Sequence, residues 1–261
     1  MAIVDAGCGP ALVLIPGIQG RWEWMRPTVD ALSTRWRVIT RSLPGEPGAR
    51  PFDPAAGFDQ FVAHVDELFD RAGLDAAVLC GISFGGLVAL RYAAQRPHRV
   101  RALILVSTPG PRWRPAAAQQ RYMARPLLMF PAFVCGAARR AAAELRATFP
   151  NVRDRFEFVR SYAWQVMRAP GVPRRMASRA KLAAAEDFSG DCARVAAPTL
   201  IVAGEPSLDR VVKIEDAREY ARCIGGAQLQ VLARTGHLGA ASAAGRFGEM
   251  IAAFLDRAGQ Q

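Results

Sequence analysis

The first candidate for chemistry in this chain is a serine between two glycines, in the stretch 81–85 (GISFG). A short apolar run that predicts a strand precedes it, and an apolar run that predicts a helix follows it at once. So tight a turn closes only if the residues two before and two after the serine lack side chains, as Gly81 and Gly85 do. Ser83 is then left at the tip of the turn, strained and exposed, with unpaired N–H groups of the helix behind it. The pattern predicts a nucleophile elbow; the alternative is a glycine-rich turn whose serine only caps the helix.

A serine hydroxyl needs a base to take its proton, and near neutral pH that base is usually a histidine. Of the three histidines, His237 directly follows the last predicted strand, and sites in open α/β sheets lie beyond the C-terminal ends of strands. His98 precedes a strand, so we expect it in a turn at the opposite edge. His64 flanks the apolar stripe of an amphipathic helix, and we expect it on the helix surface. His237 is therefore the predicted base.

The imidazole in turn needs a carboxylate that fixes its tautomer and stabilises its charged form. The loop after the predicted strand 199–203 contains two acids, Glu205 and Asp209. Glu205 follows the strand so closely that we expect it to face away or to cap the turn. Asp209 lies further out, where it can reach the loop of a neighbouring strand. Asp209 is the preferred acid and Glu205 the alternative, and the order Ser83, Asp209, His237 along the chain suits such an arrangement.

Acyl transfer also needs hydrogen-bond donors for the negative charge that develops on the substrate oxygen. We expect one donor to be the backbone N–H of Phe84, at the start of the helix after Ser83. The second should come from the loop that begins with Pro16, Gly17 and Ile18. Because proline has no N–H, Ile18 is the preferred residue, and Gly17 permits the unusual backbone path. The alternative is an ordinary strand-ending Pro-Gly turn.

The elements that must position these residues alternate between strands and helices, which predicts a doubly wound, mostly parallel sheet. Strands are expected at 11–15, 36–41, 76–80, 102–106, 199–203 and 228–232, and helices at 24–34, 58–72, 84–95, 214–224 and 243–255. Residues 111–194 interrupt the alternation, with helical stretches broken at Pro126, Pro131, Pro150 and 170–173. The prediction is a core domain of residues 1–110 and 195–261 with a helical cap inserted at 111–194.

In these features the chain resembles the α/β-hydrolase superfamily over nearly its whole length. The motifs VLIPG (13–17), CGISFGG (80–86), PTLIVAGE (198–205) and TGHL (235–238) stand in family order and spacing. Two departures are that many members carry His-Gly in place of Pro16-Gly17, and that the acid usually sits about two residues nearer the strand than Asp209.

The resemblance implies a serine hydrolase that cleaves a carboxylic ester, lactone or thioester with a hydrophobic moiety through an acyl-enzyme. A close alternative is hydrolysis of a carbon–carbon bond beside a carbonyl with the same three residues. A reading from a different class is a ligand-binding protein that keeps the fold. The intact set of serine, acid and histidine favours the enzyme. No cofactor or metal is predicted.

Composition sets the remaining bounds. The chain has 261 residues, 51% of them hydrophobic, which is enough for a large core, and no apolar run approaches the roughly 20 residues that span a bilayer. The first ten residues show no basic segment followed by an apolar one, so no signal peptide is expected. The five cysteines are scattered without metal-ligand spacing and predict reduced thiols in a cytoplasmic protein. No particular oligomeric state is predicted.

The net charge of +11 is concentrated in the predicted cap. Residues 110–185 contain 15 Lys and Arg against 3 Asp and Glu, whereas the rest of the chain is nearly balanced. A solvated arginine-rich surface is one explanation. Attraction of an anionic small-molecule substrate or of an anionic membrane surface is another. Nucleic-acid binding is not predicted, because no recognisable binding module accompanies the charge.

Overall fold

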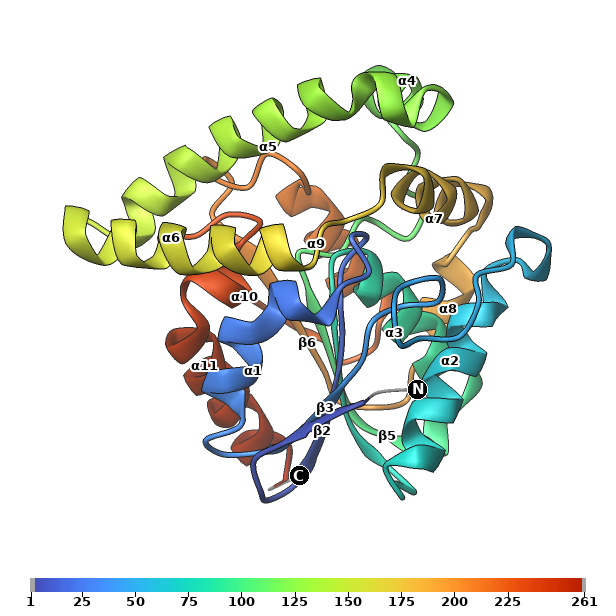
Figure 1. Ribbon diagram of the computed structural model, residues 1–261. Coiled ribbons are helices and arrows are strands. Elements are labelled where there is room, and N and C mark those ends of the chain that lie inside the picture. The colour runs from blue at the N-terminus through green and yellow to red at the C-terminus, as the bar shows by residue number, and fades with distance from the viewer. Residues whose placement is uncertain (1–2, 260–261) are drawn as a thin grey trace.

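The computed structural model describes residues 3–259, which form a seven-stranded sheet with helices on both faces (Figure 1). The strand order is β1-β3-β2-β4-β5-β6-β7, and every neighbouring pair is parallel except β1 with β3. The strands are β1 (Val4–Ala6), β2 (Ala11–Ile15), β3 (Arg37–Thr40), β4 (Ala77–Ile82), β5 (Val100–Val106), β6 (Thr199–Gly204) and β7 (Gln228–Leu232). The predicted doubly wound, mostly parallel sheet is confirmed. Only β1 was not expected, because its three residues are too few and too exposed to give a periodic signal.

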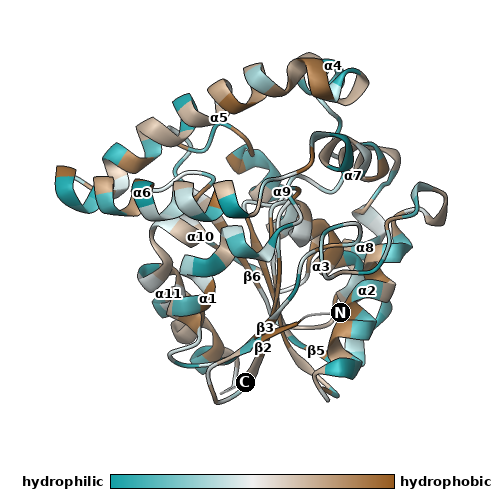
Figure 2. Cartoon of the chain, in the orientation of Figure 1, coloured by the Kyte–Doolittle hydropathy of each residue, from teal (hydrophilic) through white to brown (hydrophobic). Residues whose placement is uncertain are grey.

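The central strands are apolar at nearly every position because both of their faces are buried. Successive side chains of a strand point to opposite faces, so Leu12 and Leu14 join one apolar cluster while Val13 and Ile15 join the other. Figure 2 shows this as hydrophobic strands enclosed between the helix layers.

The helix layers are built as the alternation predicts. One face is covered by α2 (Asp59–Arg71), α3 (Phe84–Gln95), α8 (Ser189–Arg194) and α9 (Ile214–Cys223), and the other by α1 (Arg26–Leu32) and α11 (Ala244–Ala258). Short helical turns complete the core: η1 (Trp22–Met25), η2 (Pro54–Ala56), η3 (Pro97–Arg99) and α10 (Gly239–Ser242). The ends of the predicted core domain, residues 1–2 and 260–261, lie outside the described residues.

Between β5 and β6 the chain is helical and contains no strand within residues 107–198. Its helices are α4 (Ala117–Ala124), α5 (Pro126–Thr148), α6 (Val152–Arg168) and α7 (Pro173–Ala185), followed by α8. Figure 1 shows α4 to α7 together above one end of the sheet, whereas α8 packs beside α3 in the core. The break predicted at Pro131 is wrong: this proline lies inside α5. A proline removes one intrahelical hydrogen bond, and the remaining turns of a 23-residue helix are enough to continue it.

We call α4 to α7 the inserted helices. Hydrogen bonds attach them to the core at several places. The indole Nε1 of Trp24 in η1 donates to the carbonyl oxygen of Ala169, just after α6, at 2.8 Å. Arg179 of α7 and Glu144 of α5 reach the loops that follow β2 and β7. The inserted helices therefore lie over the C-terminal ends of the strands. Within residues 3–259, no helix is both long enough and apolar enough to cross a membrane.

Candidate active site

Ser83 lies at the single-residue junction between β4, which ends at Ile82, and α3, which begins at Phe84. Its backbone has φ 55° and ψ −118°, a conformation that a residue with a side chain rarely adopts. A Cβ atom added to Gly81 would collide with the backbone of Gly85, and one added to Gly85 would collide with the carbonyls after β2. The turn therefore requires glycine at both positions, and the serine hydroxyl is held at the tip beside the first turn of α3.

His237 follows β7 and faces this serine. Its Nε2 lies 3.2 Å from Oγ of Ser83, a distance at which a proton can pass between the two. The side chain of His237 is 21% exposed, and Ser83 is also partly exposed. Both side chains are therefore partly accessible from outside the protein.

Asp209 follows β6 and approaches the other nitrogen of the imidazole. Its Oδ2 lies 3.5 Å from Nδ1 of His237, which is at the outer limit of a hydrogen bond. Its Oδ1 accepts hydrogen bonds from the backbone N–H groups of Val211 and Val212, each at 3.0 Å. Burial raises the pKa of this carboxyl, but the nearby His237 and the two N–H donors outweigh burial and leave the pKa below its usual value. Asp209 is thus held as a carboxylate beside the imidazole.

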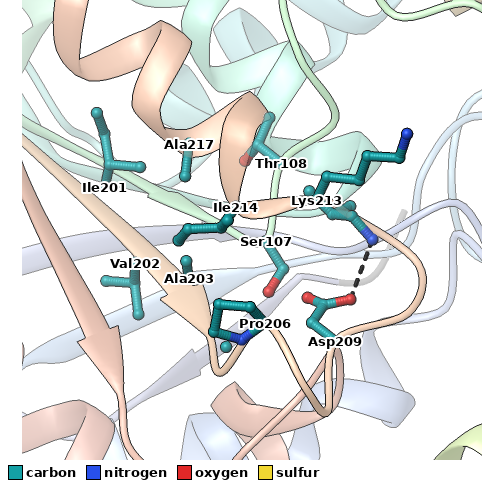
Figure 3. A pocket seen from close by; sticks show the side chains of 12 residues that line it. Ser107, Thr108, Ile201, Val202, Ala203, Pro206, Asp209, Lys213, Ile214 and Ala217 are labelled. Carbon is teal, nitrogen blue, oxygen red and sulfur yellow. Dashed lines mark hydrogen bonds between the residues drawn. The ribbon is translucent and has the colours of Figure 1, made fainter.

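The far side of Asp209 is closed by the start of α9 and the end of β5 (Figure 3). Only a pocket of about 10 Å³ remains there, too small for a substrate. Ser107, which also has a positive φ of 42°, points its hydroxyl toward the carboxylate of Asp209 in this view.

Glu205, the alternative acid, is engaged elsewhere. Its Oε1 accepts the backbone N–H of Arg234 at 2.6 Å, and its own N–H donates to the carbonyl of Thr235 at 2.8 Å. Glu205 therefore fastens the loop that carries His237, whereas Asp209 is the acid that lies next to the ring.

The loop after β2 lies directly against the serine. A Cβ atom added to Gly17 would lie 3.7 Å from Cβ of Ser83, so Gly17, which precedes Ile18, lies close to the serine. The carbonyl oxygen of Ile18 accepts a hydrogen bond from Nη1 of Arg179 at 3.0 Å. Arg179 belongs to the inserted α7 and is fully buried. Nothing in the sequence distinguishes it from the other arginines of this segment.

A second unexpected residue is Glu144 of α5. Its carboxylate accepts the backbone N–H of Leu238, the residue after His237. The available sequence signal was weak: Glu144 is one of only three acids in a strongly basic segment and stands in an alanine-rich, apolar stretch.

The other two histidines lie away from this site. His98 is exposed on the turn η3 before β5, as expected. The prediction that His64 lies on a helix surface is wrong: it is 2% exposed, and Nδ1 lies 3.0 Å from Nη2 of Arg41. The buried face of α2 therefore includes a polar residue as well as its apolar stripe. His64 can be buried there because Arg41 lies within hydrogen-bond distance of its ring.

Across residues 3–259, no group of three or more His, Cys, Asp or Glu side chains is close enough together to hold a metal ion.

Comparison with known proteins agrees with the fold. A family model described as alpha/beta hydrolase fold matches residues 10–243. A polyketide synthase of Burkholderia thailandensis, ThaQ, is 42% identical over 118 residues, which are 45% of this chain but only 6% of that protein. A 2-hydroxymuconate semialdehyde hydrolase of Pseudomonas sp. strain CF600 is 27% identical over 97% of this chain and 89% of its own length.

Among solved structures, the enol-lactonase of Burkholderia xenovorans LB400 has a similar fold. It superposes with a TM-score of 0.76 at 22% identity, over 98% of this chain and 96% of its own. The family match covers most of the chain, including the residues around Ser83, Asp209 and His237. The protein belongs to the α/β-hydrolase fold family.

Proposed function

We propose that this protein is a serine hydrolase that cleaves a carboxylic ester, lactone or thioester through an acyl-enzyme intermediate. The observation that carries the proposal is the 3.2 Å approach of His237 Nε2 to Ser83 Oγ, with Asp209 on the opposite nitrogen of the ring. Ser83 as nucleophile, His237 as base and Asp209 as carboxylate thus lie next to one another, which is the arrangement that acyl transfer needs.

In the proposed reaction, Ser83 Oγ attacks the carbonyl carbon of the substrate while His237 takes the hydroxyl proton. The backbone N–H groups of Phe84 and Ile18 donate to the oxyanion of the tetrahedral intermediate. His237 then gives its proton to the leaving alcohol or thiol, and the acyl group remains on Ser83. A water molecule, deprotonated by His237, releases the acid and restores the serine.

A hydrophobic acyl or alcohol group suits the surroundings of Ile18. This residue packs with an apolar cluster formed by helices α4, α5 and α7. The cluster comprises Tyr122, Met176 and Ala177, with Met129, Phe130 and Phe133 partly buried against them. Because the loop of Ile18 lies against Ser83, an apolar substrate group that enters beside the serine meets an apolar surface.

A second candidate is hydrolysis of a carbon–carbon bond beside a carbonyl. The hydroxymuconate semialdehyde hydrolase supports it, because the alignment spans most of both chains. The same serine, histidine and acid could serve both reactions, so substrates have to separate them.

The test is a panel of p-nitrophenyl esters of graded chain length, with 2-hydroxymuconate semialdehyde assayed in parallel. The proposal expects ester cleavage that improves with acyl length until the apolar surface is filled. Cleavage of the semialdehyde without ester cleavage would favour the carbon–carbon reaction. A protein that turns over neither and that no fluorophosphonate labels would favour a ligand-binding protein that keeps the fold.

We also propose an anionic partner for the inserted helices, either the substrate itself or a lipid surface. Of the ten large apolar side chains that are exposed within residues 3–259, eight lie on α5 and α6: Leu127, Leu128, Val134, Val152, Phe156, Val159, Trp164 and Met167. Arginines are exposed on the same two helices. Exposed apolar side chains beside positive charge are typical of proteins that touch anionic membranes. Sedimentation with phosphatidylglycerol vesicles, but not with phosphatidylcholine vesicles, would support the lipid surface.

A cytoplasmic location is part of the same proposal. It is supported by the five cysteines, all of which are free.

A further inference from the structure

Glu144 places a buried carboxylate from the inserted helices beneath the loop that carries His237. The residue is 2% exposed and belongs to the C-terminal part of α5, 94 positions before Leu238 in the chain. Its Oε1 and Oε2 lie 3.0 and 3.1 Å from the backbone nitrogen of Leu238. Oε1 also accepts the hydroxyl of Ser242 at 3.4 Å.

The same carboxylate meets the residue on the other side of the histidine. A Cβ atom added to Gly236 would lie 2.9 Å from Oε2 of Glu144, so the loop approaches this oxygen with its bare backbone. Burial raises the pKa of the Glu144 carboxyl above its usual value, although the backbone N–H groups of Leu238 and Gly236 and the nearby His237 oppose this shift. The residues before and after His237, Gly236 and Leu238, therefore both lie against the carboxylate of Glu144.

Two further hydrogen bonds attach the last turn of α5 to the start of this loop. Oγ1 of Thr148 donates to the carbonyl of Arg234 at 2.8 Å, and Nε of Arg234 donates to the carbonyl of Ala147 at 2.9 Å. Residues 144–148 thus hold the loop 234–238 at both of its ends.

Burial makes a negative charge on Glu144 costly, as the raised pKa of this carboxyl reflects. Among residues 3–259, no lysine or arginine forms an ion pair with Glu144, so the carboxylate is buried without a cationic side-chain partner. An amide oxygen could accept the same N–H groups without the desolvation penalty. The ionisable groups that act on or feel this carboxylate are His237, Asp209 and Tyr162 of α6. Only His237 can become positive.

We propose that Glu144 is a positioning residue for His237: it fixes the backbone on both sides of the imidazole, and in its ionised form it favours the imidazolium that forms while Ser83 attacks the substrate. This rests on the proposed role of His237 as the base. Asp209 approaches the imidazole no closer than 3.5 Å, which is too long for a strong hydrogen bond. The orientation of the His237 ring therefore depends strongly on how its backbone is held. A misplacement of about 1 Å can cost about a hundredfold in rate. The packing of α5 against this loop therefore determines whether His237 is positioned to act as the base.

The test compares Glu144→Gln, which keeps the shape and an acceptor oxygen but loses the charge, with Glu144→Ala, which loses both. Glu157→Gln on α6 is the matched control, because Glu157 is an acid of the same segment that is 56% exposed and pairs only with its neighbour Arg153. Glu144→Asp keeps the carboxylate on a shorter side chain.

We expect kcat for a p-nitrophenyl ester to fall about tenfold in Glu144→Gln and about a hundredfold in Glu144→Ala. KM should change by less than about threefold, because Glu144 does not face the substrate. In Glu144→Gln the acid limb of kcat/KM should move to lower pH by about one unit, since a negative charge near the imidazole is gone. Glu144→Asp should keep the position of that limb, and Glu157→Gln should behave as wild type.

A purely structural role for Glu144 makes a different prediction. Glu144→Gln and Glu144→Ala would then lower the unfolding temperature but leave the acid limb in place, or their losses would appear in KM; either result would overturn the proposal. An NMR titration of the His237 ring, identified with His237→Gln, tests the charge without catalysis. If the wild type proves inactive, the hydrolase proposal fails, whereas an unchanged titration midpoint in Glu144→Gln overturns the present inference. Glu144→Asp provides the same titration comparison if Glu144→Gln does not fold.

Discussion

Arg179 and Glu46 form an ion pair, Nη2 to Oε1, at 2.7 Å with both side chains fully buried. Nη2 of this arginine also donates to the carbonyl of Pro44, and Nη1 donates to that of Ile18. Burial is the main influence on the guanidinium and holds the pKa of Arg179 below its ordinary value, although Glu46 opposes the shift. Arg179 therefore joins the inserted α7 both to the loop after β3, which carries Glu46, and to the loop of Ile18.

The first prediction concerns this pair. Glu46→Gln leaves Arg179 buried without its carboxylate, and Arg179→Met leaves the buried Glu46 with the more distant and partly exposed Arg175. The free energy of unfolding should fall by about 3–5 kcal/mol in each variant. Chemical denaturation measures this change. Arg175→Met is the matched control, because Arg175 reaches the same Glu46 at 3.1 Å but is 36% exposed and should cost at most about 1 kcal/mol. Equal losses in the three variants would refute the importance of the buried arginine.

The second prediction tests the nucleophile. Ser83→Ala should lower ester hydrolysis by about 10⁴ to 10⁶, which is about 5–8 kcal/mol of transition-state stabilisation, and should leave the fold intact. A fluorophosphonate probe should label the wild type and spare the variant. Labelling that persists in Ser83→Ala would place the nucleophile elsewhere.

The third prediction separates the two acids. Asp209→Asn should lower kcat by roughly 10⁴, because the amide favours the wrong tautomer of His237. Glu205→Gln keeps an oxygen for the N–H of Arg234 and should cost less than about tenfold. The two kcat values decide the assignment, and a reversed order would make Glu205 the acid.

Sequence patterns predicted the elements whose signals are local. The run 11–15 became β2 and the run 84–95 became α3, because apolar periodicity and tight glycine turns depend on neighbours in the chain. The close approach of Ser83 and His237 follows from the rule that sites lie at the C-terminal ends of parallel strands. Such signals exist before the chain folds.

Contacts between distant segments left no comparable signal. Glu144 and Arg179 act on loops that are far away in the chain, and their burial depends on how α5 and α7 dock. The burial of His64 likewise depends on Arg41, which comes from another segment. A side chain whose role is set by a distant partner looks, in sequence, like any other polar residue on a helix.

The fourth prediction follows from that buried histidine. Burial, reinforced by the charge of Arg41, lowers the pKa of His64 from 6.5 to about 3. Between these two pH values the unfolded chain binds a proton that the folded chain does not, so the protein loses stability as the pH falls through this window. The loss should be about 5 kcal/mol at most.

His64→Gln tests this linkage, because the amide can still accept a hydrogen bond from Arg41 but does not titrate. Urea unfolding at a series of pH values should show a flatter dependence below 6.5 than the wild type shows. His98→Gln is the control, since His98 is exposed and its loss should leave the dependence unchanged. A His64→Gln protein with the wild-type slope would show that other groups control acid stability.

The last prediction concerns the basic inserted helices. If their arginines draw in an anionic substrate, the field acts on encounter rather than on the chemical step, and it can raise the association rate about tenfold or more. Added salt shortens the Debye length from ~10 Å at 0.1 M to ~3 Å at 1 M, so kcat/KM for a dicarboxylic monoester should drop as salt is added. A neutral ester of equal length is the control and should change little. The fastest esters available should be used, because capture must limit the rate. Equal salt dependence for the two esters would show that these arginines do not attract a small anionic substrate and form only a solvated surface.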